Sequence, residues 1–142
     1  MVRRETANAM HKHLFVYGTL MIAAEGARIG KAQRARLQRD GTSLGGATIN
    51  GRLYDLKRYP ALVASTNERV HGEVFRLANP LSSFVWLDKY EDVVPGRASN
   101  EYERVVRPVW LASGEEIAAW VYLYLAEVPN KARIADGRWQ PR

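Results

Sequence analysis

Cysteine is absent from the 142-residue sequence, which excludes disulfides and thiolate metal sites. Histidine occurs only three times and never in a pattern such as His-Glu-x-x-His, so we expect no metal centre. No apolar run approaches the roughly 18 residues of a membrane-spanning helix, and the first 12 residues lack the apolar core of a secretory signal. These absences predict a cytoplasmic protein that does not enter a membrane.

The familiar catalytic motifs are also missing. The sequence has no Gly-x-Ser-x-Gly nucleophile motif and no phosphate-binding loop that ends in Gly-Lys-Ser or Gly-Lys-Thr. Gly45 and Gly46 are adjacent, but no basic residue or helix start follows them. A turn or a bulge therefore explains this pair better than a phosphate site.

The composition is that of a globular domain, since apolar residues make up 46% and charged residues 25% of the chain. A chain of this length fits one domain, and no internal repeat or linker divides it. We expect a flexible leader over residues 1–12, a single domain over 13–128 and a basic tail over 129–142.

Positive charge is unevenly distributed along the chain. The net charge is +6, and five basic residues but no acidic one lie between Arg28 and Arg39. Such a segment is typical of a solvated helix face, or of a surface that attracts nucleic acid in a salt-sensitive way. The sequence has no recognisable nucleic-acid-binding motif, although Trp120, Tyr122 and Tyr124 would offer a stacking surface. We therefore expect no specific nucleic-acid partner.

Strands predominate in the predicted secondary structure, and two helices interrupt them. Residues 69–77 alternate as a half-buried strand does, and Asn79 followed by Pro80 is typical of a helix start. Antiparallel hairpins without strict βαβ alternation predict an α+β domain with a curled, partly closed sheet. In chain order we predict a strand at 13–17, a helix at 26–37, a strand at 47–56, an extended segment at 59–63, a strand at 69–77, a helix from 80 to 91 or 92, and a hairpin of strands 102–111 and 117–125.

The first candidate site is the turn Tyr17-Gly18-Thr19-Leu20, which follows the first predicted strand. Gly18 lets the chain turn sharply, and successive N–H groups in such a turn point into one concavity that binds anions, carboxylates included. A plain turn that ends the strand is the alternative interpretation.

The second candidate is Glu91. Residues 84, 87 and 91 lie on nearly one line of a helix, so Glu91 continues the apolar row of Phe84 and Leu87. Partial burial would raise the pKa of its carboxyl from about 4.3 towards neutrality, where a carboxylate is useful for proton transfer. The alternative is a glutamate at the helix end that pairs with Arg97 or Arg104.

Five groups of short motifs, which follow one another in the order of the family, together resemble the γ-glutamylcyclotransferase-like family. The short length of the chain resembles the compact bacterial and plant branch of that family. The resemblance extends from about Phe15 to Leu125. The motifs are Tyr17-Gly18-Thr19-Leu20; Gly51-x-Leu53-Tyr54-Asp55-Leu56 followed by Tyr59-Pro60-Ala61; Val70-x-Gly72-Glu73-Val74-Phe75; Leu87-Asp88-x-Tyr90-Glu91 with Tyr102-x-Arg104; and Ala119-Trp120-Val121-Tyr122.

The resemblance implies a small mixed barrel with flanking helices and an enzyme that needs no cofactor. It implies that a small γ-glutamyl amine or amino-acid derivative is cyclised to 5-oxoproline with release of the amine. Glu91 matches the family's catalytic glutamate, a general acid and base. The backbone of Gly18, Thr19 and Leu20 would hold the α-carboxylate of the substrate. The other expected substrate-binding residues are Tyr17, Tyr54, Tyr59, Tyr102 and Tyr122.

The sequence departs from the family pattern in two places. Asp92 follows Glu91 where glycine is frequent, and this second carboxylate is expected to raise the pKa of Glu91 further or to disturb its pose. Lys57 and Arg58 precede Tyr59 where a glycine often stands, which favours an acidic portion of the substrate.

The main alternative is a non-enzymatic ligand-binding or interaction protein on the same fold. The sequence indicates neither the oligomeric state nor the leaving amine.

Overall fold

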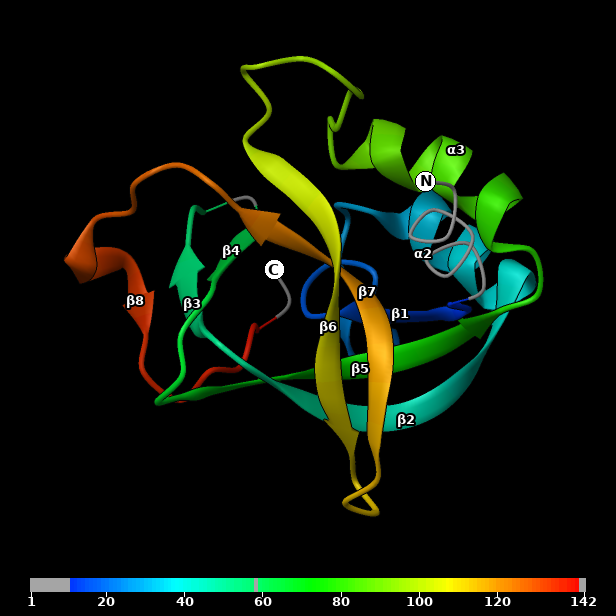
Figure 1. The fold of residues 1–142 in the computed structure, drawn as a ribbon, viewed down its shortest axis with the longest axis horizontal. Coiled ribbons are helices and arrows are strands. Elements are labelled where there is room, and N and C mark those ends of the chain that lie inside the picture. Colours follow the sequence, from blue (N-terminus) through cyan, green and yellow to red (C-terminus); the bar gives the residue numbers. More distant parts are fainter. Residues whose placement is uncertain (1–10, 58, 141–142) are drawn as a thin grey trace, which may run out of the picture.

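Over the described residues, the fold is a closed five-stranded β-barrel with a smaller sheet and two α-helices beside it (Figure 1). The computed structural model describes residues 11–57 and 59–140. The barrel strands are ordered β1-β5-β2-β6-β7, and the smaller sheet has the order β4-β3-β8. The strands are β1 (His13–Val16), β2 (Gly41–Asn50), β3 (Arg52–Asp55), β4 (Pro60–Val63), β5 (Arg69–Leu77), β6 (Tyr102–Leu111), β7 (Glu116–Tyr124) and β8 (Arg133–Ile134). The helices are α2 (Lys31–Asp40) and α3 (Pro80–Tyr90), with short 3-10 helices at Ile22–Ala24 and Asn130–Ala132.

The predicted α+β fold with a small mixed barrel is confirmed. Neighbouring barrel strands run antiparallel except β1 and β7, whose parallel contact between Leu14 and Trp120 closes the barrel. No helix in the described part of the chain is long and apolar enough to cross a membrane.

Three elements form where local sequence signals predict them. β5 covers the predicted residues 69–77. Asn79 caps α3, because its side-chain oxygen accepts a hydrogen bond from the Ser82 N–H at 3.3 Å, and Pro80 occupies the first helical position. β6 and β7 form the predicted hairpin, and Gly114 in its turn has a left-handed φ of +91°.

Other boundaries differ from the prediction. The helix predicted at 26–37, α2, begins at Lys31 rather than at Gly26, because Gly26 and Gly30 have φ values of +94° and +79°, which a right-handed helix does not accommodate. The strand predicted at 47–56 consists of two strands, β2 and β3, which join different sheets.

Residues 1–10 of the predicted leader lie outside the described residues. The division of the chain at residue 128 remains a prediction. In the segment after it, β8 pairs with β3 and Trp139 is buried.

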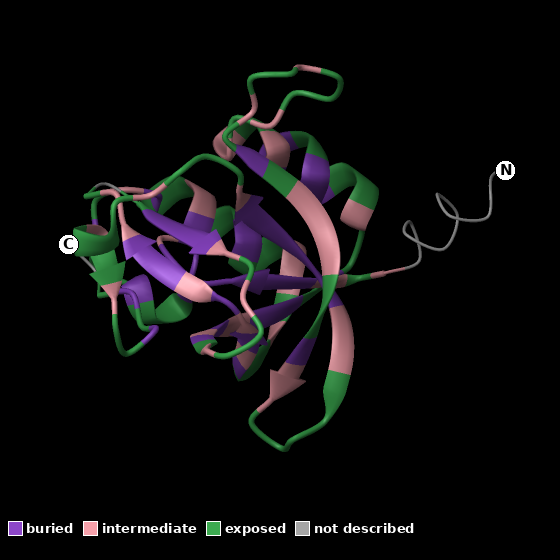
Figure 2. Cartoon of the chain, turned by 60° about the vertical axis from the view of Figure 1, so that its left-hand side comes forward, coloured by how far each residue is buried: buried purple, intermediate pink, exposed green. Residues whose placement is uncertain are grey.

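The hydrophobic core fills the barrel and continues beneath α3. Figure 2 shows the buried residues gathered on the strands and the exposed ones mainly on the loops. Phe84 of α3 packs edge-on against Trp120 of β7 with ring centroids 5.5 Å apart, while Ala119 and Val121 on the other face of β7 are fully buried. Both faces of β7 are therefore covered, and the helix that covers one of them ends beside the turn that follows β1.

Candidate active site

A cavity of about 340 Å³ lies where β1 ends near the C-terminus of α3. Its wall combines the turn after β1, the start of β4, the end of α3 and tyrosines from β6 and β7. All the predicted site residues except Tyr54 contribute to it. The lining residues are Phe15, Val16, Tyr17, Gly18, Thr19, Leu20, Ile29, Tyr59, Pro60, Tyr90, Glu91, Asp92, Glu101, Tyr102 and Tyr122.

The turn after β1 is held tightly against its neighbours. A Cβ at Gly18 would lie 2.7 Å from Pro60 Cγ, so only glycine leaves room for this contact. The side-chain oxygen of Thr19 lies 2.7 Å from the Tyr90 hydroxyl oxygen. Within the described residues, no acceptor is bonded to the N–H groups of Gly18, Thr19 or Leu20. The turn therefore offers unused backbone donors at the cavity wall.

Two charged side chains hold the turn and the segment after it. Arg34 of α2 is buried, and its guanidinium donates to the Thr19 carbonyl at 2.6 Å. Glu73 of β5 accepts hydrogen bonds from the N–H groups of Ile22 and Ala23 at 2.6 and 3.1 Å. Hydrogen bonds with one ionised partner are stronger than neutral ones, so these contacts fix the segment well.

Glu91 is the C-cap residue of α3 and lines the cavity. Phe84 and Leu87 of the same helical row are buried, and Glu91 itself is half-buried. Burial raises the pKa of the Glu91 carboxyl from 4.5 to about 7, and the nearby Asp88 carboxylate adds to the rise. A carboxyl group with this pKa exchanges protons readily near neutral pH.

The cations that were the alternative partners of Glu91 are paired with other carboxylates. Arg104 binds both carboxylate oxygens of Asp88, at 2.8 and 3.2 Å, and Arg97 lies 3.3 Å from Asp92. No ion pair among the described residues includes Glu91. The expected second carboxylate that raises the pKa of Glu91 is therefore Asp88 rather than Asp92.

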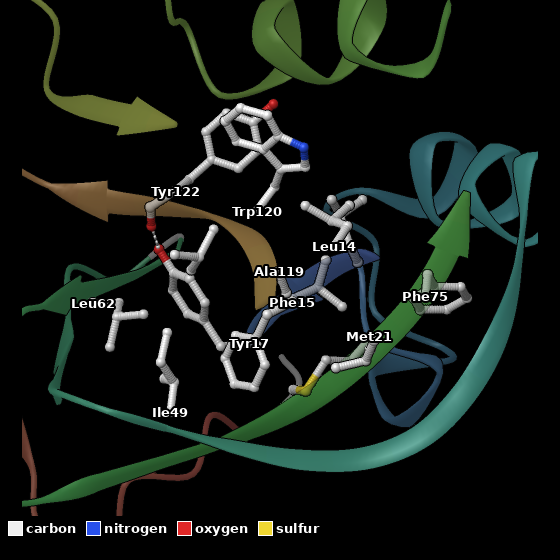
Figure 3. Packing of buried hydrophobic residues seen from close by; sticks show 14 of the residues in the cluster. Leu14, Phe15, Tyr17, Met21, Ile49, Leu62, Phe75, Ala119, Trp120 and Tyr122 are labelled. Atoms are coloured by element: carbon white, nitrogen blue, oxygen red, sulfur yellow. Dashed lines mark hydrogen bonds between the residues drawn. The ribbon is translucent and has the colours of Figure 1, made fainter. Parts of the chain in front are cut away.

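The hydroxyls of three buried tyrosines form hydrogen bonds that link the elements of the cavity wall. The Tyr122 hydroxyl donates to Asp88 at 2.6 Å. The Tyr17 hydroxyl donates to the Tyr122 carbonyl at 2.6 Å, as Figure 3 shows. The Tyr102 hydroxyl donates to the Pro60 carbonyl at 2.9 Å. Burial raises the pKa of all three hydroxyls, and the negative charge of the neighbouring carboxylates adds to it. They therefore stay protonated and act as fixed donors.

The remaining predicted residues lie in different places. Tyr59 is 40% exposed at the cavity, with its ring 6.3 Å from that of Tyr102. Tyr54 is buried in β3 and does not line the cavity, so it is left out of the site. Lys57 is not a lining residue either, and Arg58 lies outside the described residues.

Several lining residues were not among the predicted substrate-binding residues, although Tyr90 is part of a family motif and Asp92 was expected beside Glu91. They include Tyr90, Asp92 and Glu101. The interpretation of segment 28–39 as a solvated helix face is wrong for Arg34, which is 2% exposed. Its spacing of three residues from Leu37 is the signal that places both on the inner face of α2. The other basic residues of the segment are exposed: Arg28, Lys31, Arg36 and Arg39.

The chemistry available at the cavity is that of a carboxyl group with a raised pKa and of backbone donors. The described residues contain no group of three or more His, Asp or Glu side chains arranged to hold a metal ion. Glu91 has a pKa suited to taking up and returning a proton, and the Gly18–Leu20 turn presents backbone donors to an anion.

Comparisons with solved structures relate the chain to proteins of the same fold. Similarity to YkqA from Bacillus subtilis covers 92% of this chain but 40% of YkqA, with 21% identity and a TM-score of 0.63. At5g39720.1 from Arabidopsis thaliana is 25% identical over 86% of this chain and 73% of its own, with a TM-score of 0.58. A gamma-glutamyl cyclotransferase is 19% identical over 80% of this chain and 66% of its own, with a TM-score of 0.55.

A comparison of the sequence with models of protein families gives a match over nearly the whole chain. No curated protein matches the chain. The sequence model of the family described as "Gamma-glutamyl cyclotransferase, AIG2-like" matches residues 14–141, which include every barrel residue except His13 and every residue of the cavity. The chain therefore belongs to the gamma-glutamyl cyclotransferase, AIG2-like family.

Proposed function

We propose that the protein is a γ-glutamylcyclotransferase that converts a γ-glutamyl amine or amino-acid derivative to 5-oxoproline and releases the amine. The observation that carries the proposal is the position of Glu91. This carboxyl group lines the same cavity as the Gly18–Leu20 turn, has a pKa of about 7 and is paired with no cation among the described residues. A structural ion pair would have lowered this pKa instead.

The reaction needs no nucleophile from the protein, because the substrate carries its own. Glu91, as the carboxylate, takes a proton from the α-ammonium group of the substrate. The freed amine attacks the γ-carbonyl carbon, so that a carbon–nitrogen bond forms and a tetrahedral intermediate results. Glu91 then returns the proton to the leaving nitrogen, and the bond from that nitrogen to the γ-carbon breaks as the carbonyl re-forms. The ring nitrogen releases its second proton to water, which leaves the neutral lactam of 5-oxoproline. One group thus acts first as base and then as acid.

Binding of the α-carboxylate would set the geometry of this cyclisation. We assign that role to the backbone donors of the Gly18–Leu20 turn, which have no other acceptor among the described residues. An anchored carboxylate and an enclosing wall of Tyr17, Tyr102 and Tyr122 would bend the flexible chain of the substrate so that its amine approaches its own carbonyl. Orientation of this kind lowers the barrier of an intramolecular reaction by several kcal/mol.

The test is to measure 5-oxoproline by mass spectrometry after incubation with γ-glutamyl derivatives of amino acids, neutral amines and cationic amines. The wild type, Glu91→Gln and the control Glu103→Gln, which alters an exposed carboxyl on β6, are compared after circular dichroism has confirmed their folding. We expect product from the wild type and the control and a loss of at least about 100-fold in Glu91→Gln. The best substrate identifies the leaving amine.

Two outcomes would contradict the proposal. Equal product from the wild type and Glu91→Gln would show that another group transfers the protons. No product from any member of the panel, combined with binding of 5-oxoproline by the folded wild type, would indicate the non-catalytic ligand-binding role instead.

A further inference from the structure

Arg34 occupies an unusual position for a residue of a basic helix. Its side chain is 3% exposed, and its guanidinium donates to three carbonyl groups of the loop that connects β1 to α2. These are the carbonyls of Thr19 at 2.6 Å, Ala27 at 2.8 Å and Ile29 at 3.4 Å. A single side chain thus ties both ends of the loop to the helix that follows it.

The charge of Arg34 is only weakly compensated by the protein. Its one carboxylate neighbour within ion-pair distance in the described residues is Glu25, whose side chain lies 4.0 Å away and is 79% exposed. A solvated carboxylate at that distance offsets little of a buried cation. Burial of a cation is costly unless hydrogen bonds and a nearby anion stabilise it. Three carbonyls supply the hydrogen bonds, and no buried anion in the described part of the chain supplies the charge.

The field of Arg34 reaches the cavity. Burial raises the pKa of the Tyr90 hydroxyl, and the Arg34 charge is one of the effects that oppose this rise. Tyr90 lines the cavity and touches Thr19, whose carbonyl Arg34 binds. The guanidinium therefore lies directly behind the turn that forms the cavity wall.

The hydrogen bond to Thr19 also determines the direction of a backbone donor. In a planar trans peptide the C=O and the following N–H point to opposite sides, and the described residues contain no cis peptide. Because the Thr19 carbonyl points at Arg34, the Leu20 N–H points away from Arg34. Thr19 and Leu20 line the cavity, and this N–H has no acceptor within the described residues.

We propose that Arg34 is a positioning residue for the substrate α-carboxylate: it turns the Thr19–Leu20 peptide so that its N–H faces the carboxylate, and it places a positive charge behind that peptide. The proposal rests on the proposed function for the identity of the anion. The bound carboxylate would then be the missing counter-charge of the buried guanidinium. Arg34 itself would not touch the substrate.

The experiment compares two ring compounds that differ only in the carboxylate, 5-oxoproline and 2-pyrrolidinone. Their dissociation constants are measured by calorimetry on the wild type, Arg34→Lys, Arg34→Met and the control Arg39→Met. The control removes the same charge from an exposed position of α2. We expect the wild type and the control to prefer 5-oxoproline, and Arg34→Met to lose about tenfold or more of this preference while its affinity for 2-pyrrolidinone changes little.

Arg34→Lys and a chemical rescue separate positioning from a general loss of structure. An ammonium group keeps the charge but cannot reach three carbonyls in a fork, so Arg34→Lys should retain part of the preference. Guanidinium ion at a concentration well below that which unfolds the protein should restore the preference of Arg34→Met. In turnover, the Arg34 variants should show a raised KM with a smaller change in kcat.

The outcomes distinguish this proposal from the proposed reaction. Unchanged preference in both Arg34 variants, or an equal loss of affinity for both rings, would overturn the role of Arg34 even where the wild type produces 5-oxoproline. A wild type without preference for the carboxylated ring would overturn it as well. A preference that depends on Arg34 in a protein that forms no 5-oxoproline would support the anion site and refute the reaction.

Discussion

Replacement of Glu91 by glutamine is expected to stabilise the folded protein at neutral and alkaline pH while it removes the proposed activity. The pKa of Glu91 is raised from 4.5 to about 7 by folding, so the folded state binds more protons than the unfolded state between these values. The free energy of unfolding therefore falls as the pH rises from 4.5 to 7, and this contribution is lost above 7. The difference between the two pKa values corresponds to about 3 kcal/mol. Glutamine does not ionise and avoids this loss.

The assay is urea denaturation of the wild type and Glu91→Gln, followed by tryptophan fluorescence between pH 4.5 and 8. We expect the variant to gain little at pH 4.5 relative to the wild type and about 3 kcal/mol at pH 8, with most of the change below pH 7. Glu103→Gln, at an exposed carboxyl, serves as the control. A stability difference that does not depend on pH would refute the reasoning, because it would mean that Glu91 ionises in the fold as it does in the unfolded chain.

Three further predictions concern the network around the cavity. Asp88→Asn removes a charge that raises the pKa of Glu91. The acidic limb of the pH dependence of kcat/KM is expected near 7 in the wild type and should therefore move to lower pH in the variant. An unmoved limb would show that the Asp88 charge does not affect the pKa of Glu91. Gly18→Ala would bring a Cβ to 2.7 Å from Pro60, so it should cost about 1–3 kcal/mol of stability, measured by denaturation, and abolish 5-oxoproline binding. Unaltered binding would show that the turn accommodates the added methyl group. Tyr102→Phe leaves the buried Pro60 carbonyl without its 2.9 Å donor and should cost about 1–3 kcal/mol, whereas a cost near zero would indicate that water replaces the hydroxyl.

The parts of the fold that were predictable depend on neighbours in the sequence. Asn79 and Pro80 start α3 because capping involves atoms within three residues of each other. The alternation in residues 69–77 follows from the two-residue period of a strand. The row of Phe84, Leu87 and Glu91 likewise follows from helical geometry. In each case the local period or cap is sufficient, whatever the rest of the chain does.

The conformation of the loop before α2 was not predictable in the same way. A helix is predicted over residues 26–37, yet Gly26 and Gly30 take left-handed φ values and delay the start of α2. Gly30 does so where a Cβ would lie 2.5 Å from the Tyr90 hydroxyl oxygen, a contact between residues 60 positions apart. Helix propensity contains no information about such a neighbour.

The sequence by itself determined strand β5, the start of α3, the hairpin of β6 and β7, the row that carries Glu91 and the glycine turn after β1, because all of these depend on short-range periodicity and turn chemistry. Only the tertiary structure decided that Glu91 shares a cavity with that turn, that Asp88 and not Asp92 raises its pKa, and that Arg34 is buried behind Thr19. These features arise from barrel closure and from the packing of α3 on β7, which bring distant segments together. Burial and the field of neighbouring charges are properties of that assembly, and no local pattern contains them.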